Sequence, residues 1–245
     1  MEPAIYARMA AVEDKHWWFS ARRSIVNSVL SSLPLPSTTD ILEVGCGSGG
    51  NLAMLAQYGQ VYAIEPEPEA LAMAEKKGLA AIKPGLLPHD IPYEDKQFDL
   101  IVLLDVLEHV DDDRQALQIL RERLKPGGWL ILTVPAFAWL WSQHDVSHHH
   151  HRRYAKQELL GLARNTGLSI RKVSHFNFWL FPLIAMVRLI QRVGRQQGDS
   201  DGLSLPPPWL NRLLFTLFAS ERHLMRRTAL PFGVSLLLCA QRMED

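Results

Sequence analysis

The chain has 245 residues, 47% of them hydrophobic, which is enough for one substantial core and excludes a disordered protein. Its 26 basic and 26 acidic residues cancel, so the overall charge gives no reason to expect a nucleic-acid partner. Two cysteines, Cys46 and Cys239, are too few for a disulfide framework or a cysteine metal site.

The order of elements predicts the fold class. The first residues carry acids where a signal peptide needs a basic region, so we expect a cytoplasmic protein. A helix is expected from about Phe19 to Leu33, and apolar runs then alternate with helical patterns. The predicted strands are residues 41–44, 61–64, 80–82, 98–104, 129–134, 168–174 and 234–240. This alternation predicts an α/β fold with a doubly wound, seven-stranded, mostly parallel sheet.

The stretch ILEVGCGSGG, residues 41–50, has the pattern of a strand that runs into a glycine-rich turn and then a helix. Such a turn lies at the carboxyl edge of a doubly wound sheet, where ligands bind. Gly45, Gly47 and Gly50 fit G-x-G-x-x-G, so a dinucleotide has to be considered. Residues 40–60 contain no Lys or Arg, however, and Glu43 would repel a phosphate. A ligand with an ammonium and a sulfonium group fits this charge better.

Three segments in register, LEVGCGSG, VYAIEPE and FDLIVLLDVLEHV, resemble the class I S-adenosylmethionine-dependent methyltransferases over residues 41–135. The resemblance implies that Glu43, Gly45 and Gly47 line the methionine and ribose part of S-adenosylmethionine. It also implies that Glu65 binds the ribose hydroxyls and that Asp105 lies near the amino-acid end. The cofactor-binding residues expected on this basis are Glu43, Gly45, Cys46, Gly47, Gly49, Asn51, Glu65, Pro66, Leu87 and Asp105.

Two further segments concern the cofactor. Many relatives have an acid that binds the adenine amine in the segment aligned with residues 85–93, but the matching residue here is Leu87, so we expect backbone amides and apolar contacts to hold adenine. Near the start of the chain, HWWFSARR resembles a cap segment of a bacterial methyltransferase subfamily. The resemblance implies that Trp17 closes over the cofactor and that Arg22 reaches its carboxylate; plain packing of the tryptophan is the alternative.

The chemistry of the transfer needs few side chains. The methyl group of a sulfonium is already activated, so the enzyme mainly aligns the acceptor, and a base is needed only for a hydroxyl. His109, just after the fourth predicted strand, is our first candidate base, and His144 is the second. Each could instead only tie down its loop. Asp105, Glu108 and His109 have a D-x-x-E-H spacing similar to one in quinone O-methyltransferases and could ligate a cation, but metal-free relatives share these letters, and we predict no metal.

An insertion separates the last two predicted strands. Residues 178–187 are ten continuous apolar residues, too few to span a bilayer. Residues 209–227 form an amphipathic helical pattern. One face is apolar and the other is basic; the apolar face has Leu210, Leu213, Leu214, Leu217, Phe218, Leu224 and Met225, and the basic face has Arg212, Arg222, Arg226 and Arg227. A lid or a homodimer interface is the first interpretation of this pattern. The second is a membrane-surface element, since residues 178–230 hold seven Arg against three acidic residues.

We therefore predict one methyltransferase domain over residues 1–245, with a cap (1–35), a Rossmann-like cofactor-binding core (36–175), a helical insertion (176–230) and a last strand (231–245). It transfers methyl from S-adenosylmethionine to a small-molecule or lipid-linked acceptor, and oxygen is the favoured acceptor atom. One alternative is an NAD-dependent oxidoreductase. Another is a catalytically silent, membrane-associated protein that binds a nucleoside.

Overall fold

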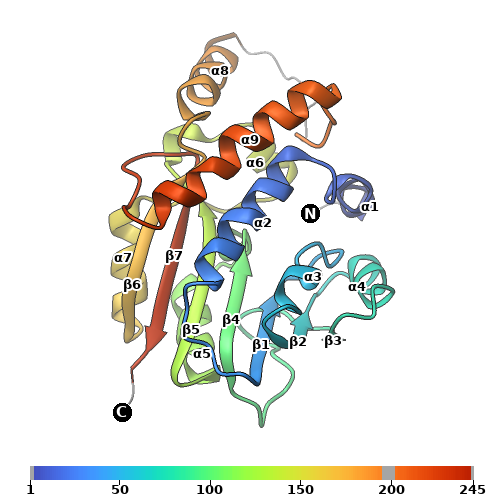
Figure 1. Cartoon of the computed structure of the whole chain (residues 1–245), viewed down its shortest axis with the longest axis vertical. Helices are drawn as coiled ribbons and strands as arrows, with labels where there is room; N and C mark the ends of the chain where they lie inside the picture. Colours follow the sequence, from blue (N-terminus) through green and yellow to red (C-terminus); the bar gives the residue numbers. More distant parts are fainter. Residues whose placement is uncertain (1–2, 195–201, 244–245) are drawn as a thin grey trace.

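A seven-stranded sheet lies at the centre of the computed structural model, which describes residues 3–194 and 202–243 (Figure 1). The strands follow the order β3-β2-β1-β4-β5-β7-β6, and all pairs are parallel except those of β7, which runs antiparallel to β5 and β6. The strands are β1 (Thr39–Val44), β2 (Gly59–Ile64), β3 (Ala81–Lys83), β4 (Phe98–Leu104), β5 (Leu124–Pro135), β6 (Leu168–Phe176) and β7 (Ser235–Arg242). All seven predicted strands are confirmed, and the sheet is doubly wound.

Helices cover both faces of this sheet and its carboxyl edge. They are α1 (Pro3–Val12), α2 (Trp17–Leu30), α3 (Leu52–Leu55), α4 (Pro68–Glu75), α5 (Asp113–Arg123), α6 (Gln143–Ser147), α7 (Lys156–Asn165), α8 (Phe181–Gly194) and α9 (Pro208–Met225), with single 3-10 turns at Leu107–His109 and Ala138–Leu140. Asp112 caps the start of α5, because its side chain accepts a hydrogen bond from the backbone N–H of Gln115 at 2.8 Å. Among the described residues, none of the helices has the length and apolar character needed to cross a bilayer.

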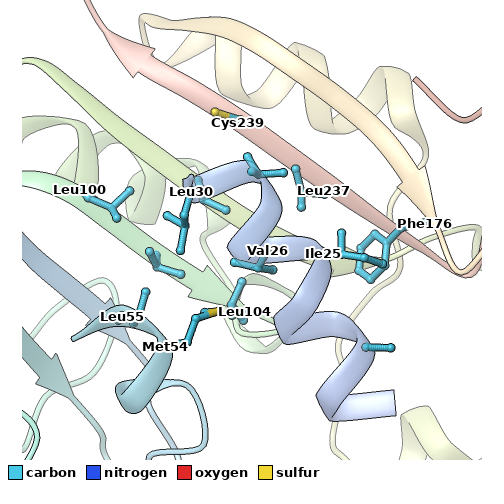
Figure 2. Packing of buried hydrophobic residues seen from close by; sticks show 14 of the residues in the cluster. Ile25, Val26, Leu30, Met54, Leu55, Leu100, Leu104, Phe176, Leu237 and Cys239 are labelled. Atoms are coloured by element: carbon cyan, nitrogen blue, oxygen red, sulfur yellow. The ribbon is translucent and has the colours of Figure 1, made fainter. Parts of the chain in front are cut away.

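The sheet is buried on both faces, which explains the continuous apolar runs in the sequence. Along β4, Leu100, Val102 and Leu104 point into the core under α2 and α3, whereas Ile101 and Leu103 point into the core under α5 and α7. Figure 2 shows the first of these cores, in which side chains of α2 meet those of β4, β6 and β7. The rigid sheet that results fixes the positions of the loops at its carboxyl edge.

The inserted segment forms α8 and α9, and the predicted faces of α9 are right only in part. α9 lies beside α2 (Figure 1), and its buried side chains include Phe218 and Met225, while Leu213, Leu217 and Leu224 are exposed. Arg212 and Arg227 are exposed, as predicted, whereas the other two arginines of that face contact α2. Arg222 donates to the hydroxyl of Ser24 at 2.6 Å, and Arg226 donates to that of Ser28 at 3.0 Å. Serines on the neighbouring helix provide acceptors there, and a hydrophobic pattern alone does not reveal them.

Candidate active site

A cavity of about 1470 Å³ opens at the carboxyl edge of the sheet. The loops that follow β1, β2, β4 and β5 line it, and α1, α2 and α8 close its sides. Ligand sites in open α/β sheets lie at this edge. Because a pocket for one small molecule usually measures about 300–1,000 Å³, this cavity has room for a cofactor and an acceptor together.

The glycine loop leaves space for a ligand. Gly45 has φ of +69°, and a Cβ there would lie 2.7 Å from Val106, so no larger residue fits. Gly47 has φ of +54°, and a Cβ there would meet no protein atom within 4 Å. Gly45, Cys46 and Gly47 line the cavity, whereas Gly49 does not. The thiol of Cys46 is buried, and burial raises its pKa.

Glu65 lies beside the glycine loop, just after β2. It is almost fully buried, and its Oε2 accepts the backbone N–H of Gly47 at 2.7 Å while its Oε1 accepts that of Glu67 at 3.1 Å. Burial raises the pKa of Glu65, although these hydrogen bonds favour the charged form. Its neighbour Pro66 is exposed and lines the cavity. A carboxylate in this position can bind the two hydroxyls of a ribose.

Glu43 lies beneath the glycine loop and does not line the cavity. Nδ2 of Asn51, which does line the cavity, donates to Oε1 of Glu43 at 2.8 Å. Burial raises the pKa of Glu43 to about 7, against the opposing effects of the Asn51 hydrogen bond and the Arg22 charge. Glu43 thus orients the loop through Asn51, and a direct contact with a ligand in the cavity would require the loop to move.

Asp105 and Arg22 meet at the cavity wall. Asp105 has φ of +59°, and its carboxylate forms an ion pair with Arg22 and accepts the hydroxyl hydrogen bond of Thr133 at 2.9 Å. The backbone N–H of Trp17 donates to Oδ1 of Asn211 in α9, which holds the start of α2 in place. The side chains of Trp17 and Arg22 line the cavity. Arg22 therefore pairs with Asp105 at the cavity wall. We expect the carboxylate of the cofactor to bind beside this cation.

The segment expected to hold adenine is apolar. Leu87 is buried and lines the cavity together with Ile64, Gly85 and Leu86. Asp90 does not line the cavity, and its backbone forms two hydrogen bonds with the backbone of Leu86. The arrangement fits recognition of a flat base by apolar contacts and backbone groups.

Both candidate bases line the cavity, and so do His148 and His150 of the histidine run. The rings of His109 and His150 are 4.8 Å apart, and those of His144 and His150 are 5.9 Å apart. Burial lowers the pKa of His109 to about 4 and that of His144 to about 3, so both are neutral near pH 7. Glu108 is fully buried beside them, and burial raises its pKa well above the usual range.

Asp145 holds the histidine-rich loop after β5. Its Oδ1 accepts from Nδ1 of His150 at 2.9 Å and from Nε of Arg153 at 2.7 Å, and its Oδ2 accepts from Arg153 at 3.0 Å. Burial alone would raise the pKa of Asp145, but the His150 hydrogen bond and the Arg153 charge outweigh it and hold the pKa well below its usual range. Arg188 of α8 lies 3.6 Å from Oδ2, which ties the insertion to this loop.

Sequence reasoning missed two contributions from the start of the chain. Tyr6 and Glu13 line the cavity, and Glu13 accepts from the hydroxyl of Ser48 and from Nζ of Lys77, both at 2.7 Å. It also missed that His150, rather than another member of the histidine run, is the one oriented by Asp145. No spacing in the sequence predicts either contact, because each joins segments brought together only by the fold.

Comparison with known proteins agrees with this geometry, since residues 16–173, more than half of the chain, match the methyltransferase domain family. The chain belongs to that family. This methyltransferase uses S-adenosylmethionine, and the cavity fits that cofactor: Gly47 leaves open space, Glu65 offers a carboxylate beside it, and Arg22 offers a cation. The expectation of an S-adenosylmethionine-dependent enzyme is confirmed.

The chain is also similar to particular relatives and solved structures, and it spans less than half the length of the curated relative described next. It is 32% identical over 101 residues to the ubiquinone biosynthesis O-methyltransferase of Albidiferax ferrireducens, a match that covers 38% of this chain and 40% of that relative. It shares its fold with an S-adenosylmethionine-dependent methyltransferase of Mesorhizobium loti (TM-score 0.58, 17% identity, 94% and 100% of the two chains). It also shares its fold with phosphoethanolamine N-methyltransferase 2 of Haemonchus contortus, solved with S-adenosylmethionine (TM-score 0.53, 16% identity, 89% and 52% of the chains).

Proposed function

We propose that this methyltransferase transfers the methyl group to a hydroxyl oxygen of an acceptor that carries an apolar tail. The proposal rests on one observation: the two ends of the cavity are lined by different kinds of residue. One end has the glycine loop and Glu65, and the other has apolar side chains that continue onto the exposed surface. A cofactor at the first end and an acceptor at the second would meet near His109.

The acceptor end has no clear boundary with the outer surface. Trp139, Trp141, Leu183 and Val187 line the cavity, and each is also between 39% and 53% exposed. Other exposed apolar residues of α8 follow directly, among them Met186 and Ile190. Because this apolar surface begins inside the cavity, an acceptor could place its reactive group inside and extend an apolar chain over α8.

The transfer needs alignment and the removal of one proton. S-adenosylmethionine supplies an activated methyl group on a positively charged sulfur. The hydroxyl oxygen forms a bond to the methyl carbon, the carbon–sulfur bond breaks with its electron pair on sulfur, and the hydroxyl proton leaves. His109 and His150 both line the cavity, and His150 is oriented through Asp145, so either can accept that proton at its free ring nitrogen.

The relatives support oxygen as the acceptor atom. The Albidiferax protein is described as an O-methyltransferase, whereas the Haemonchus protein, which shares only the fold, is described as an N-methyltransferase. The sequence match therefore favours oxygen, and the fold alone favours neither atom.

A radiolabelled transfer assay tests the proposal. The purified protein is incubated with S-adenosylmethionine labelled in its methyl group and with aqueous or organic-solvent extracts of bacterial membranes. We expect label in the organic phase, in a product that resists mild alkaline hydrolysis as an ether does. Label confined to aqueous products, or a product in which the methyl group is bonded to nitrogen, would contradict the proposal.

A further inference from the structure

The carboxyl group of Glu108 has no hydrogen-bond partner in the described part of the chain. The residue is fully buried, and neither Oε1 nor Oε2 accepts or donates a hydrogen bond. Nε2 of His150 lies 4.0 Å from its Oε1, too far for a hydrogen bond. A buried carboxylate without a counter-charge is strongly disfavoured, and a protonated one would still leave its O–H without an acceptor. Something else therefore has to satisfy this group.

Two imidazoles face the same point. Glu108, His109 and His150 each offer one ligand atom, and these atoms all lie within 4.8 Å of one another. All three residues line the cavity, so the space between them is open on one side. Ligand atoms bound tetrahedrally to one ion lie roughly 3.3–3.6 Å apart, so side-chain movements on the order of 1 Å would complete the site.

Each of the two histidine rings is already held by one hydrogen bond. Nδ1 of His150 donates to the carboxylate of Asp145 at 2.9 Å, which directs Nε2 toward Glu108. The ring of His109 hydrogen-bonds to the backbone of His149. Metal-ligating histidines usually have this kind of partner, a carboxylate or a backbone carbonyl, on the nitrogen that does not bind the ion. The orientation of both rings is thus fixed without an ion.

We propose that Glu108, His109 and His150 bind one divalent transition-metal ion at the wall of the cavity. Two imidazole nitrogens and one carboxylate oxygen form a ligand set suited to ions such as Zn²⁺ or Co²⁺, with an open position toward the cavity. The set differs from the one that the D-x-x-E-H spacing suggested, because Asp105 is occupied by Arg22 and Thr133. It also departs from our sequence-based expectation of no metal.

The site deepens the proposed function and rests on it for its role. With the ion bound, His109 and His150 would be its ligands and not the base. An ion with an open position toward the cavity could bind the acceptor hydroxyl and lower its pKa, so that the proton leaves to solvent and the oxygen reacts as the stronger nucleophile. The binding of the ion itself does not depend on the acceptor. The two claims can therefore fail separately.

Cobalt titration tests the site directly. The full-length protein, freed of any affinity tag and treated with EDTA, is titrated with CoCl₂ while the visible absorption of bound Co²⁺ is recorded. We expect one ion per chain, displaced by one equivalent of Zn²⁺. Glu108→Gln and His150→Asn should each weaken binding at least about 100-fold, more than loss of a supporting residue usually does. His151→Asn is the matched control, because His151 is exposed, lies next to His150 and pairs with Asp111.

Several outcomes would overturn the site. One is a wild-type protein that binds no Co²⁺, a result that needs no variant to fold. Another is Co²⁺ binding that persists in both variants and is lost in His144→Asn or His148→Asn. S-adenosylhomocysteine binding to the same samples, measured by calorimetry, shows whether each variant is folded. Cobalt binding without methyl transfer would leave the site standing and contradict the proposed function, and methyl transfer without cobalt binding would do the reverse.

Discussion

The backbone N–H of Gly47 lies 2.7 Å from Oε2 of Glu65, and this contact joins the glycine loop after β1 to the end of β2. The open space over Gly47 and the carboxylate beside it form one edge of the cavity. A ribose bound there could pack against the backbone of Gly47, and its two hydroxyls could donate to the Glu65 carboxylate. The first prediction follows from this pair.

Glu65→Gln should weaken S-adenosylhomocysteine binding about 10- to 100-fold. The amide cannot accept two charge-assisted hydrogen bonds from a ribose diol, each worth about 1.5–3 kcal/mol. Isothermal titration calorimetry measures the change. Glu69→Gln, at an exposed position in α4, should bind as tightly as the wild type. Unchanged affinity in Glu65→Gln would show that the ribose lies elsewhere.

Arg22→Gln should distinguish the two ends of the cofactor. The variant removes the cation beside Asp105, so it should weaken S-adenosylhomocysteine, which has a carboxylate, about tenfold or more. Binding of 5′-methylthioadenosine, which lacks the amino-acid end, should be unchanged. Equal losses for both ligands, in parallel calorimetric titrations, would contradict the role assigned to Arg22.

Glu43→Gln should change how stability depends on pH. Burial raises the folded-state pKa of Glu43 from about 4.5 to about 7, so the folded state holds its proton more tightly than the unfolded state. This contribution is fully present below about pH 4.5 and is lost as pH rises through 7. The wild type should therefore lose about 2.5 kcal/mol of unfolding free energy relative to the variant between pH 5 and pH 8. Urea unfolding at several pH values measures this difference, and parallel pH curves would contradict it.

Asp145→Asn should destabilise the protein by about 3–5 kcal/mol, because it leaves the buried charge of Arg153 without its partner. Asp111→Asn is the matched control, since that carboxylate is exposed and its ion pair with His151 should contribute little. Urea unfolding at pH 7 compares them. A loss in Asp145→Asn no larger than in the control would show that the loop is held in another way.

The exposed apolar residues of α8 should bind a membrane surface if the acceptor is embedded there. We expect the protein to sediment with anionic vesicles, and Ile190→Asp, at a side chain 62% exposed, to reduce this several-fold. Leu79→Asp, at an exposed position before β3, should have no effect. Equal recovery of wild type and Ile190→Asp in the supernatant would argue against membrane contact.

The sequence alone predicted the sheet well and the active site only in part. The central strands, such as β4, were recognisable because both of their faces are buried, so their apolar runs are continuous. The glycine loop and Glu65 were recognisable because their spacing follows from one strand-turn-helix unit. His150, by contrast, depends on Asp145 and on a contact with Glu108, more than 40 residues away, and the orientation of α9 depends on serines in α2. Such contacts depend on tertiary packing, and they produce no periodic pattern of residues in the sequence.

A crystal structure of the S-adenosylhomocysteine complex tests the central claim most directly, namely that one cavity holds the cofactor beside a separate acceptor end. We expect both ribose hydroxyls within hydrogen-bond distance of the Glu65 carboxylate and the sulfur directed toward His109. A ribose away from Glu65, or a sulfur directed away from the apolar end lined by Trp139 and Leu183, would contradict it.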